Sequence, residues 1–161
     1  ISVLSAVGIC QSLIMVSLLL TVNGLEPSSI GKLLLLSILT AVVSVSIVMF
    51  FNLLFDKVGS FLMLIFLILQ LSGSGGTYPI QLSNPFFEAI HPYLPMTYSI
   101  DAYRQLFGLG GSISTDLFIL SAILIVFNLL IILFYAIKRK QLRKEDFEVE
   151  EESAALETQT A

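Results

Sequence analysis

Four long apolar runs dominate this sequence and limit it to a membrane fold. They cover about residues 1–22, 33–55, 58–77 and 117–137, and the third weakens at the glycine- and serine-rich stretch 72–77. An apolar helix of about 20 residues crosses the roughly 30 Å hydrocarbon core of a bilayer. Only 12% of the residues are charged, about half the share found in soluble domains. We therefore predict an all-α, polytopic transmembrane helical bundle with four spans.

A proline-rich segment, residues 79–113, separates the third and fourth runs. Proline disfavours helix in the residue before it, and three prolines divide this segment into short pieces: Pro85, Pro92 and Pro95. Asn84 before a proline is a typical helix start, so we predict one short helix at about 85–91 and another at about 96–107. Both are too short to cross a bilayer. We expect two external or re-entrant helices before the last span.

The second short helix has an amphipathic pattern. Four side chains recur at i, i+4, i+7 and i+11 and predict one apolar face: Met96, Ile100, Tyr103 and Phe107. Three polar residues fall on the opposite face, Asp101, Arg104 and Gln105, and Gly108 provides a stop. We interpret this segment as an external gate helix. Its candidate functional residues are Pro95, Thr97, Asp101, Tyr103 and Arg104.

Two interpretations of the charged pair Asp101 and Arg104 are open. They contact a substrate headgroup, or they form an ordinary surface ion pair at i, i+3, which is worth under about 1 kcal/mol. The second interpretation is the favoured one.

Four polar residues lie in or near the spans: Gln11, Asn52, Gln70 and Asn128. Polar side chains in hydrocarbon are costly and often mark a transport pathway. The alternative is a hydrogen bond to a neighbouring helix, worth about 0.6–2 kcal/mol, which we favour because none of the four is ionised. The second run also carries small residues at spacings that permit close helix approach: Ser37, Thr40, Ala41 and Ser44. No charged residue lies in mid-span, which argues against a proton-coupled carrier.

We find no catalytic constellation, and we expect no catalytic, cofactor-binding or metal-ligating residues and no enzyme activity. Glu88 and His91 stand at i, i+3 but lack the third ligand that a zinc site needs. Cys10 is the single cysteine, so no disulfide forms within the chain. The expected partner is the lipid bilayer, not nucleic acid.

The densest group of basic residues directly follows the fourth run and predicts a cytoplasmic location for that end: Lys138, Arg139, Lys140, Arg143 and Lys144. With four spans, both ends of the chain are cytoplasmic and residues 79–113 are external. We therefore divide the chain into a transmembrane domain, residues 1–137, and a basic-then-acidic cytoplasmic tail, residues 138–161. We expect the tail to be disordered or a frayed helix.

The order of these elements resembles the ABC-2-type permease domain. More closely, residues 1–144 resemble the C-terminal membrane region of the phage infection protein (YhgE/Pip) family of Gram-positive bacteria. The most specific motifs stand in the proline-rich segment: Asn84-Pro85-Phe86-Phe87, Leu94-Pro95-Met96-Thr97-Tyr98 and Asp101-Ala102-Tyr103-Arg104.

This resemblance implies a multi-pass protein of the bacterial plasma membrane, with this chain as the C-terminal part of a longer protein. It implies a homodimer, a cytoplasmic ATPase subunit as partner, and export of an amphiphilic or cell-surface substrate. The two short helices would cap the outer end of the path. One departure is the internal loop 56–59, which is too short for a coupling helix. The alternative function is a non-transporting anchor or scaffold for an extracellular domain, such as a phage receptor or a type VII secretion-related component.

Overall fold

The computed structural model describes residues 2–22, 24, 27–55, 57–76, 79–109 and 112–160. Within these residues every regular element is a helix, so the prediction of an all-α fold is confirmed. The chain divides into two compact units, Ile1–Phe127 and Asn128–Ala161. Asp56 and Thr77, which belong to the predicted internal loop and third span, lie outside the described residues.

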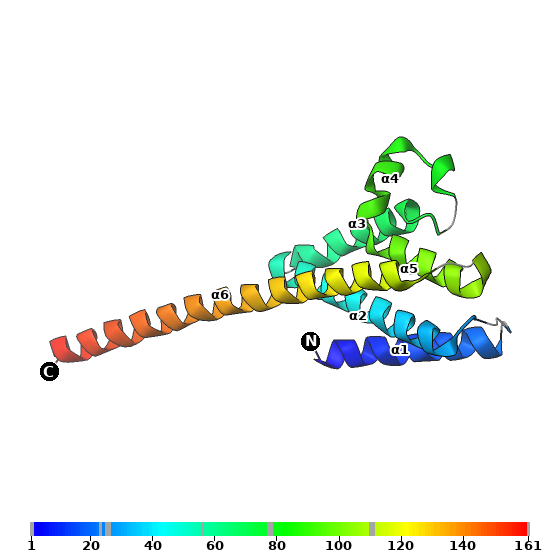
Figure 1. Cartoon of the computed structure of the whole chain (residues 1–161). Coiled ribbons are helices and arrows are strands. Elements are labelled where there is room, and N and C mark those ends of the chain that lie inside the picture. The colour runs from blue at the N-terminus through cyan, green and yellow to red at the C-terminus, as the bar shows by residue number, and fades with distance from the viewer. Residues whose placement is uncertain are drawn as a thin grey trace. The chain divides into compact units, whose positions relative to one another are not determined.

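The elements follow one another as long helices interrupted by a cluster of short ones (Figure 1). They are α1 (Ser2–Thr21), α2 (Ile30–Phe55), α3 (Lys57–Gly73), η1 (Ile80–Leu82), α4 (Pro85–Ile90), η2 (His91–Tyr93), α5 (Pro95–Arg104), the wider turn η3 (Gln105–Leu109) and α6 (Ser114–Thr160). We refer to α4, η2 and α5 together as the hairpin.

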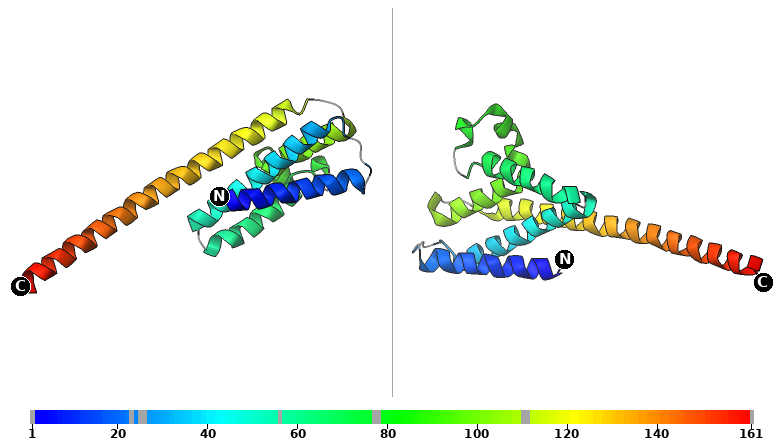
Figure 2. Two further views of the ribbon diagram at one scale, coloured as in Figure 1. Left: turned by 90° about the horizontal axis from the view of Figure 1, so that it is seen from below. Right: turned by 180° about the vertical axis from the view of Figure 1, so that it is seen from behind.

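Helix α2 is the centre of the first unit. It packs against α1, α3 and α5, and Figures 1 and 2 show α1 and α2 running alongside each other. Leu33, Leu36 and Ile47 on α2 are buried. Six of the 26 residues of α2 are buried, whereas among the described side chains of α1 only Val16 is. The outer surface of α1 is therefore left for lipid or another protein surface, as expected for a bundle whose solvent is hydrocarbon.

Helix α3 is shorter than the predicted third span of residues 58–77. Its 17 residues end at Gly73 and extend about 26 Å at 1.5 Å per residue, less than the roughly 30 Å hydrocarbon core. The chain bends at residues 74–76. Gly75 has a backbone φ of 70° there, which residues other than glycine rarely adopt. Three helices of the described part are long and apolar enough to cross a bilayer: Val3–Thr21, Ile30–Phe55 and Ser114–Arg139. The third predicted span, residues 58–77, stays a prediction.

The short helices begin where the sequence predicts. The side-chain oxygen of Asn84 accepts a hydrogen bond from the backbone amide of Phe86 at 3.0 Å, which caps α4. Helix α5 begins at Pro95, and the wider turn that follows it reaches Leu109. Gly108 has a φ of 137° there, so the predicted stop residue does adopt a conformation that favours glycine.

The second unit contains the carboxyl-terminal part of α6. The backbone is helical as far as Thr160, which corresponds to the helical alternative of the two states predicted for the tail. Lysine, glutamate, glutamine, alanine and leucine are good helix formers and make up most of this segment.

The close packing of α3 on α2 predicts a strong effect of one methyl group. A Cβ atom at Gly59 would lie 2.5 Å from the carbonyl oxygen of Phe51 and 2.8 Å from the Cα of Asn52. Backbone atoms cannot move aside cheaply, so Gly59→Ala should lower the free energy of unfolding by about 1–3 kcal/mol. The measurement is denaturation of the purified protein in detergent.

The matched control for this substitution is Gly31→Ala on α2. No atom lies within 4 Å of a Cβ built there, and alanine is favoured over glycine in helices by up to about 1 kcal/mol. Gly31→Ala should be neutral or stabilising. Equal losses at both positions would contradict the packing described for α2 and α3.

Candidate functional site

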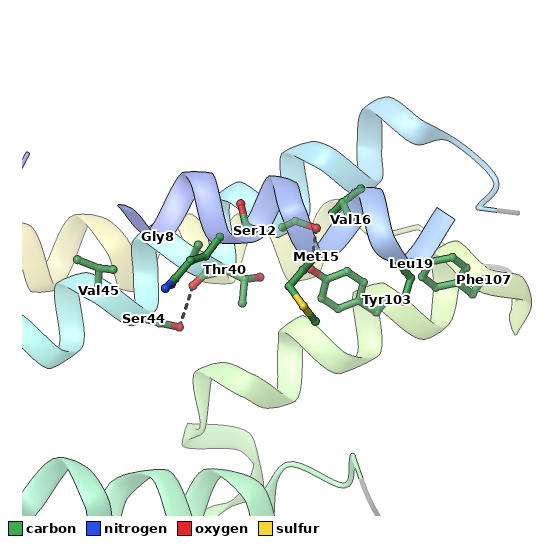
Figure 3. Close-up of a pocket in the computed structure, with 13 residues that line it drawn as sticks. Gly8, Ser12, Met15, Val16, Leu19, Thr40, Ser44, Val45, Tyr103 and Phe107 are labelled. Carbon is green, nitrogen blue, oxygen red and sulfur yellow. Dashed lines mark hydrogen bonds between the residues drawn. The ribbon is translucent and has the colours of Figure 1, made fainter. Parts of the chain in front are cut away.

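A groove of about 700 Å³ opens between α1, α2 and α5 in the first unit (Figure 3). Thirteen residues line this groove: Gly8, Gln11, Ser12, Met15, Val16, Leu19, Ser37, Thr40, Ala41, Ser44, Val45, Tyr103 and Phe107. Its volume lies within the range of about 300–1,000 Å³ that small-molecule sites occupy.

Helical spacing explains which residues line the groove. The lining residues of α1 recur every three or four positions between Gly8 and Leu19, so they form one stripe along that helix. Those of α2 recur in the same way between Ser37 and Val45 and are mostly small. A Cβ at Gly8 would lie 3.1 Å from a methyl carbon of Val45, so α1 and α2 approach closely at this point.

The groove has a polar end and an apolar end. Figure 3 shows Ser12, Thr40 and Ser44 towards the end at which Gly8 lies, and Leu19 and Phe107 at the other. None of the lining side chains carries a formal charge. The arrangement can therefore hold a molecule that is apolar along one part and forms hydrogen bonds along another.

Helix α5 borders the groove and contacts α2 through hydroxyl groups. The hydroxyl groups of Tyr103 and Ser37 lie 2.8 Å apart, and those of Ser99 and Thr40 lie 3.2 Å apart. Ser37 already donates its proton to the carbonyl oxygen of Leu33, so Tyr103 is the donor in the first pair. Burial raises the pKa of the Tyr103 hydroxyl above its usual value, and the hydrogen bond to Ser37 offsets part of this rise.

The predicted faces of α5 are wrong by one position. The fully buried residues are Pro95, Thr97, Ser99 and Ala102, followed by Leu106 in the adjoining turn. The four residues of the predicted apolar face, from Met96 to Phe107, are only half-buried. Small side chains let α5 lie close to α2, and this closeness outweighs the burial of larger side chains. Gln105, predicted on the polar face, is half-buried and donates to Asp116 at 3.0 Å.

The remaining gate residues have structural contacts. Pro95 is the first residue of α5, and the hydroxyl of Thr97 donates to the carbonyl oxygen of His91 at 2.8 Å. Arg104 and Asp101 lie 3.6 Å apart, each a little over 40% exposed. This is the geometry of the surface ion pair that the sequence favours; a role in substrate contact stays a prediction.

The end of α3 is held by two side chains of the hairpin. The Nδ1 atom of His91 lies 2.6 Å from the carbonyl oxygen of Gly73, and a guanidinium nitrogen of Arg104 donates to the carbonyl oxygen of Gly75 at 2.5 Å. A carbonyl can only accept, so Nδ1 carries the proton. Neither contact was predicted from the sequence, because each joins residues far apart in the chain.

The structure separates the four polar residues predicted in or near the spans. Gln11 lines the groove. Asn52 accepts a hydrogen bond from Ser60 at 3.0 Å, which is the helix-to-helix contact that the sequence favours. Gln70 is half-buried on α3, and Asn128 lies on α6 in the second unit. The structure therefore brings Gln11 and Tyr103 onto one groove, and Asn52 and Gln70 do not line it.

Metal ligation has no support in the described part of the chain, where no group of three histidine, cysteine or acidic residues is placed to hold an ion. His91 uses Nδ1 for the contact with Gly73 instead.

The contact between Tyr103 and Ser37 gives a testable coupling energy. A double-mutant cycle of Tyr103→Phe and Ser37→Ala should yield about 0.6 kcal/mol, with about 1.7 kcal/mol as the upper limit found for such bonds in membranes. Denaturation of the four proteins in detergent measures it. Tyr93→Phe is the control, since Tyr93 is 82% exposed. A coupling of zero would show that the two hydroxyl groups do not bond.

The two contacts of Arg104, with Asp101 and with Gly75, are predicted to contribute unequally to the free energy of unfolding. Asp101→Asn removes an exposed ion pair and should change the free energy of unfolding by under about 1 kcal/mol. Arg104→Gln also removes the donor to Gly75. It should therefore lower the free energy of unfolding by more than Asp101→Asn does, and it should increase protease cleavage near residues 74–79. A larger effect of Asp101→Asn than of Arg104→Gln would contradict this assignment.

Comparison with known proteins agrees with the helical membrane architecture. The family model described as ABC-2 type transporter matches residues 1–108, which include α1, α2, α3 and the whole hairpin. The chain is 39% identical over 109 residues to protein YhgE of Bacillus subtilis, a stretch that is 68% of this chain and 14% of that relative. No solved structure matches the chain with significance. The chain is thus a multi-pass membrane protein and a relative of YhgE, and it belongs to the ABC-2 type transporter family.

Proposed function

We propose that this chain is part of the membrane subunit of an exporter that moves an amphiphilic or cell-surface substrate across the bacterial plasma membrane. The observation that carries this proposal is the groove, which lies between two helices of membrane-spanning length and is bordered by α5. Membership of the ABC-2 type transporter family supports it. The chain spans only 14% of YhgE, so the activity of the whole protein also depends on other parts.

The proposal includes two partners. A second copy would complete a path that one bundle cannot enclose, and a cytoplasmic ATPase would supply energy, as is usual in this family. Only residue 56 separates α2 from α3, so a coupling element for the ATPase would have to lie elsewhere in the protein. This short connection is also the observation that favours the second candidate function, a non-transporting anchor or scaffold for an extracellular domain.

The two functions differ in what purification and transport assays should show. For an exporter, the full-length protein reconstituted with its ATPase should hydrolyse ATP faster when substrate is present, and cells that lack the protein should accumulate that substrate. For a scaffold, ATP hydrolysis and export should be unchanged. No stimulation by extracts of the host envelope, together with normal export in the deletion strain, would reject the exporter.

The proposed topology gives a separate prediction. In a Cys10→Ser background, a cysteine at Tyr93 on the hairpin should react with a membrane-impermeant maleimide added to intact cells. A cysteine at Arg139 should react only after the membrane is permeabilised. Both side chains are exposed, so access to the side chain does not limit either reaction. The reverse pattern would place both ends of the chain outside and overturn the orientation.

A further inference from the structure

We infer that the groove between α1, α2 and α5 is the cargo site, and that the cargo is an uncharged amphiphile. Its hydrogen-bonding part lies against Gln11 and Ser44, and its hydrocarbon part lies against Met15, Leu19 and Phe107. This inference rests on the proposed export function, because it identifies the bound molecule with the exported one. The binding site itself is testable without transport.

The lining excludes a charged cargo group. Among the residues that the structure describes, no lysine, arginine, histidine or acidic side chain lines the groove. A charge placed there would lose its water without gaining an opposite charge, which is strongly unfavourable. The nearest candidates on the hairpin, Asp101 and Arg104, pair with each other and are absent from the lining. A neutral molecule pays no such penalty.

The polar end has unused hydrogen-bonding capacity. The amide of Gln11 is exposed in the groove and has no hydrogen-bond partner among the described residues. An amide offers two donors and an acceptor, and leaving it unpaired in hydrocarbon is costly. Ser12 and Ser44 donate to carbonyl oxygens of their own helices, so their oxygen atoms can still accept. This set suits a hydroxyl or amide group, which both donates and accepts.

The apolar end determines the shape of the rest of the cargo. The lining stripe of α1 from Gly8 to Leu19 extends about 17 Å at 1.5 Å per residue. Beyond Ser12, the stripe consists of Met15, Val16 and Leu19, and Phe107 of the turn after α5 faces them. A single hydrocarbon chain fits a site of this length and of about 700 Å³, whereas a polymer does not.

A second copy of the chain is the main competing partner for Gln11. In a two-fold symmetric interface the same patch faces itself. The groove of one copy would then face the groove of the other, and both grooves would stay unfilled, which is poor packing. The concave shape of the groove therefore favours a small molecule over a second copy, and the experiment below includes the dimer as an outcome.

The test uses the full-length natural protein in lipid nanodiscs and two photoreactive probes. One is a monoacylglycerol with a diazirine in its chain, and the other is the alkyl sulfate of the same chain, which stays anionic at neutral pH. We expect the neutral probe to label peptides of α1 and α2 and the anionic probe to label them about tenfold less. Equal labelling by the two probes would overturn the inference.

Three variants locate the site. Gln11→Leu removes the amide at similar volume and should reduce labelling by about tenfold, the effect of about one hydrogen bond to a buried group. Ser44→Phe should fill the groove and abolish labelling; Ser44 is exposed there, so the larger ring avoids the core. Gln70→Leu on α3, outside the groove, is the control and should label normally. Unchanged labelling of Gln11→Leu would overturn the inference, even if Ser44→Phe fails to fold.

A cysteine at Gln11 in the Cys10→Ser background tests the dimer. Quantitative disulfide dimers after mild oxidation in membranes would show that a second copy occupies the groove, which rejects a cargo site. We expect no disulfide between two copies at this position, because the groove would hold cargo and the proposed dimer would use another face. Transport then separates the two proposals. If Gln11→Leu loses labelling but exports normally, the groove is not the cargo site and export stands; if the wild-type protein is labelled and never exports, the exporter is rejected.

Discussion

A helix that ends within a membrane bundle leaves its last carbonyl groups without amide partners, and the hairpin of this chain solves that problem for α3. Unpaired backbone groups are very costly in hydrocarbon, so irregular backbone occurs there only where protein covers it. Helix α3 ends after 17 residues, and His91 and Arg104 then bond the carbonyl oxygens of Gly73 and Gly75. The short third run and the proline-rich hairpin are thus parts of one structural solution.

The same hairpin also defines the groove. Helix α5 lies close enough to α2 for hydroxyl groups to meet, because Ser99 and Ala102 are small and fully buried. Tyr103 both donates to Ser37 and lines the groove. One short helix therefore bonds the bend that follows α3 through Arg104 and borders the groove beside α2 through Tyr103. This arrangement links the end of α3 to the site at which we place the cargo.

Sequence patterns predicted what depends on local chemistry. The helical class, the Asn84 cap and the positive φ of Gly108 follow from hydropathy, capping and turn preferences, and all three are present. The buried face of α5 was wrong, because apolar periodicity counts large side chains whereas close helix contact in a membrane selects small ones. The contacts of His91 and Arg104 join residues 18 and 29 positions apart, and no local pattern encodes such pairs.

The hydrogen bonds of the hairpin differ in strength between the side that faces α3 and the side that faces α2. This difference affects how the groove would open during the proposed export. Towards α3, Arg104 is a charged donor, and such hydrogen bonds are about twice as strong as neutral ones. Towards α2, the contacts are neutral hydroxyl pairs, which average about 0.6 kcal/mol in membranes. A displacement of α5 therefore costs least on the side of Ser37 and Tyr103. The bend after α3 therefore holds α5 more strongly than α2 does, and opening of the groove during the proposed export would separate α5 from α2 first.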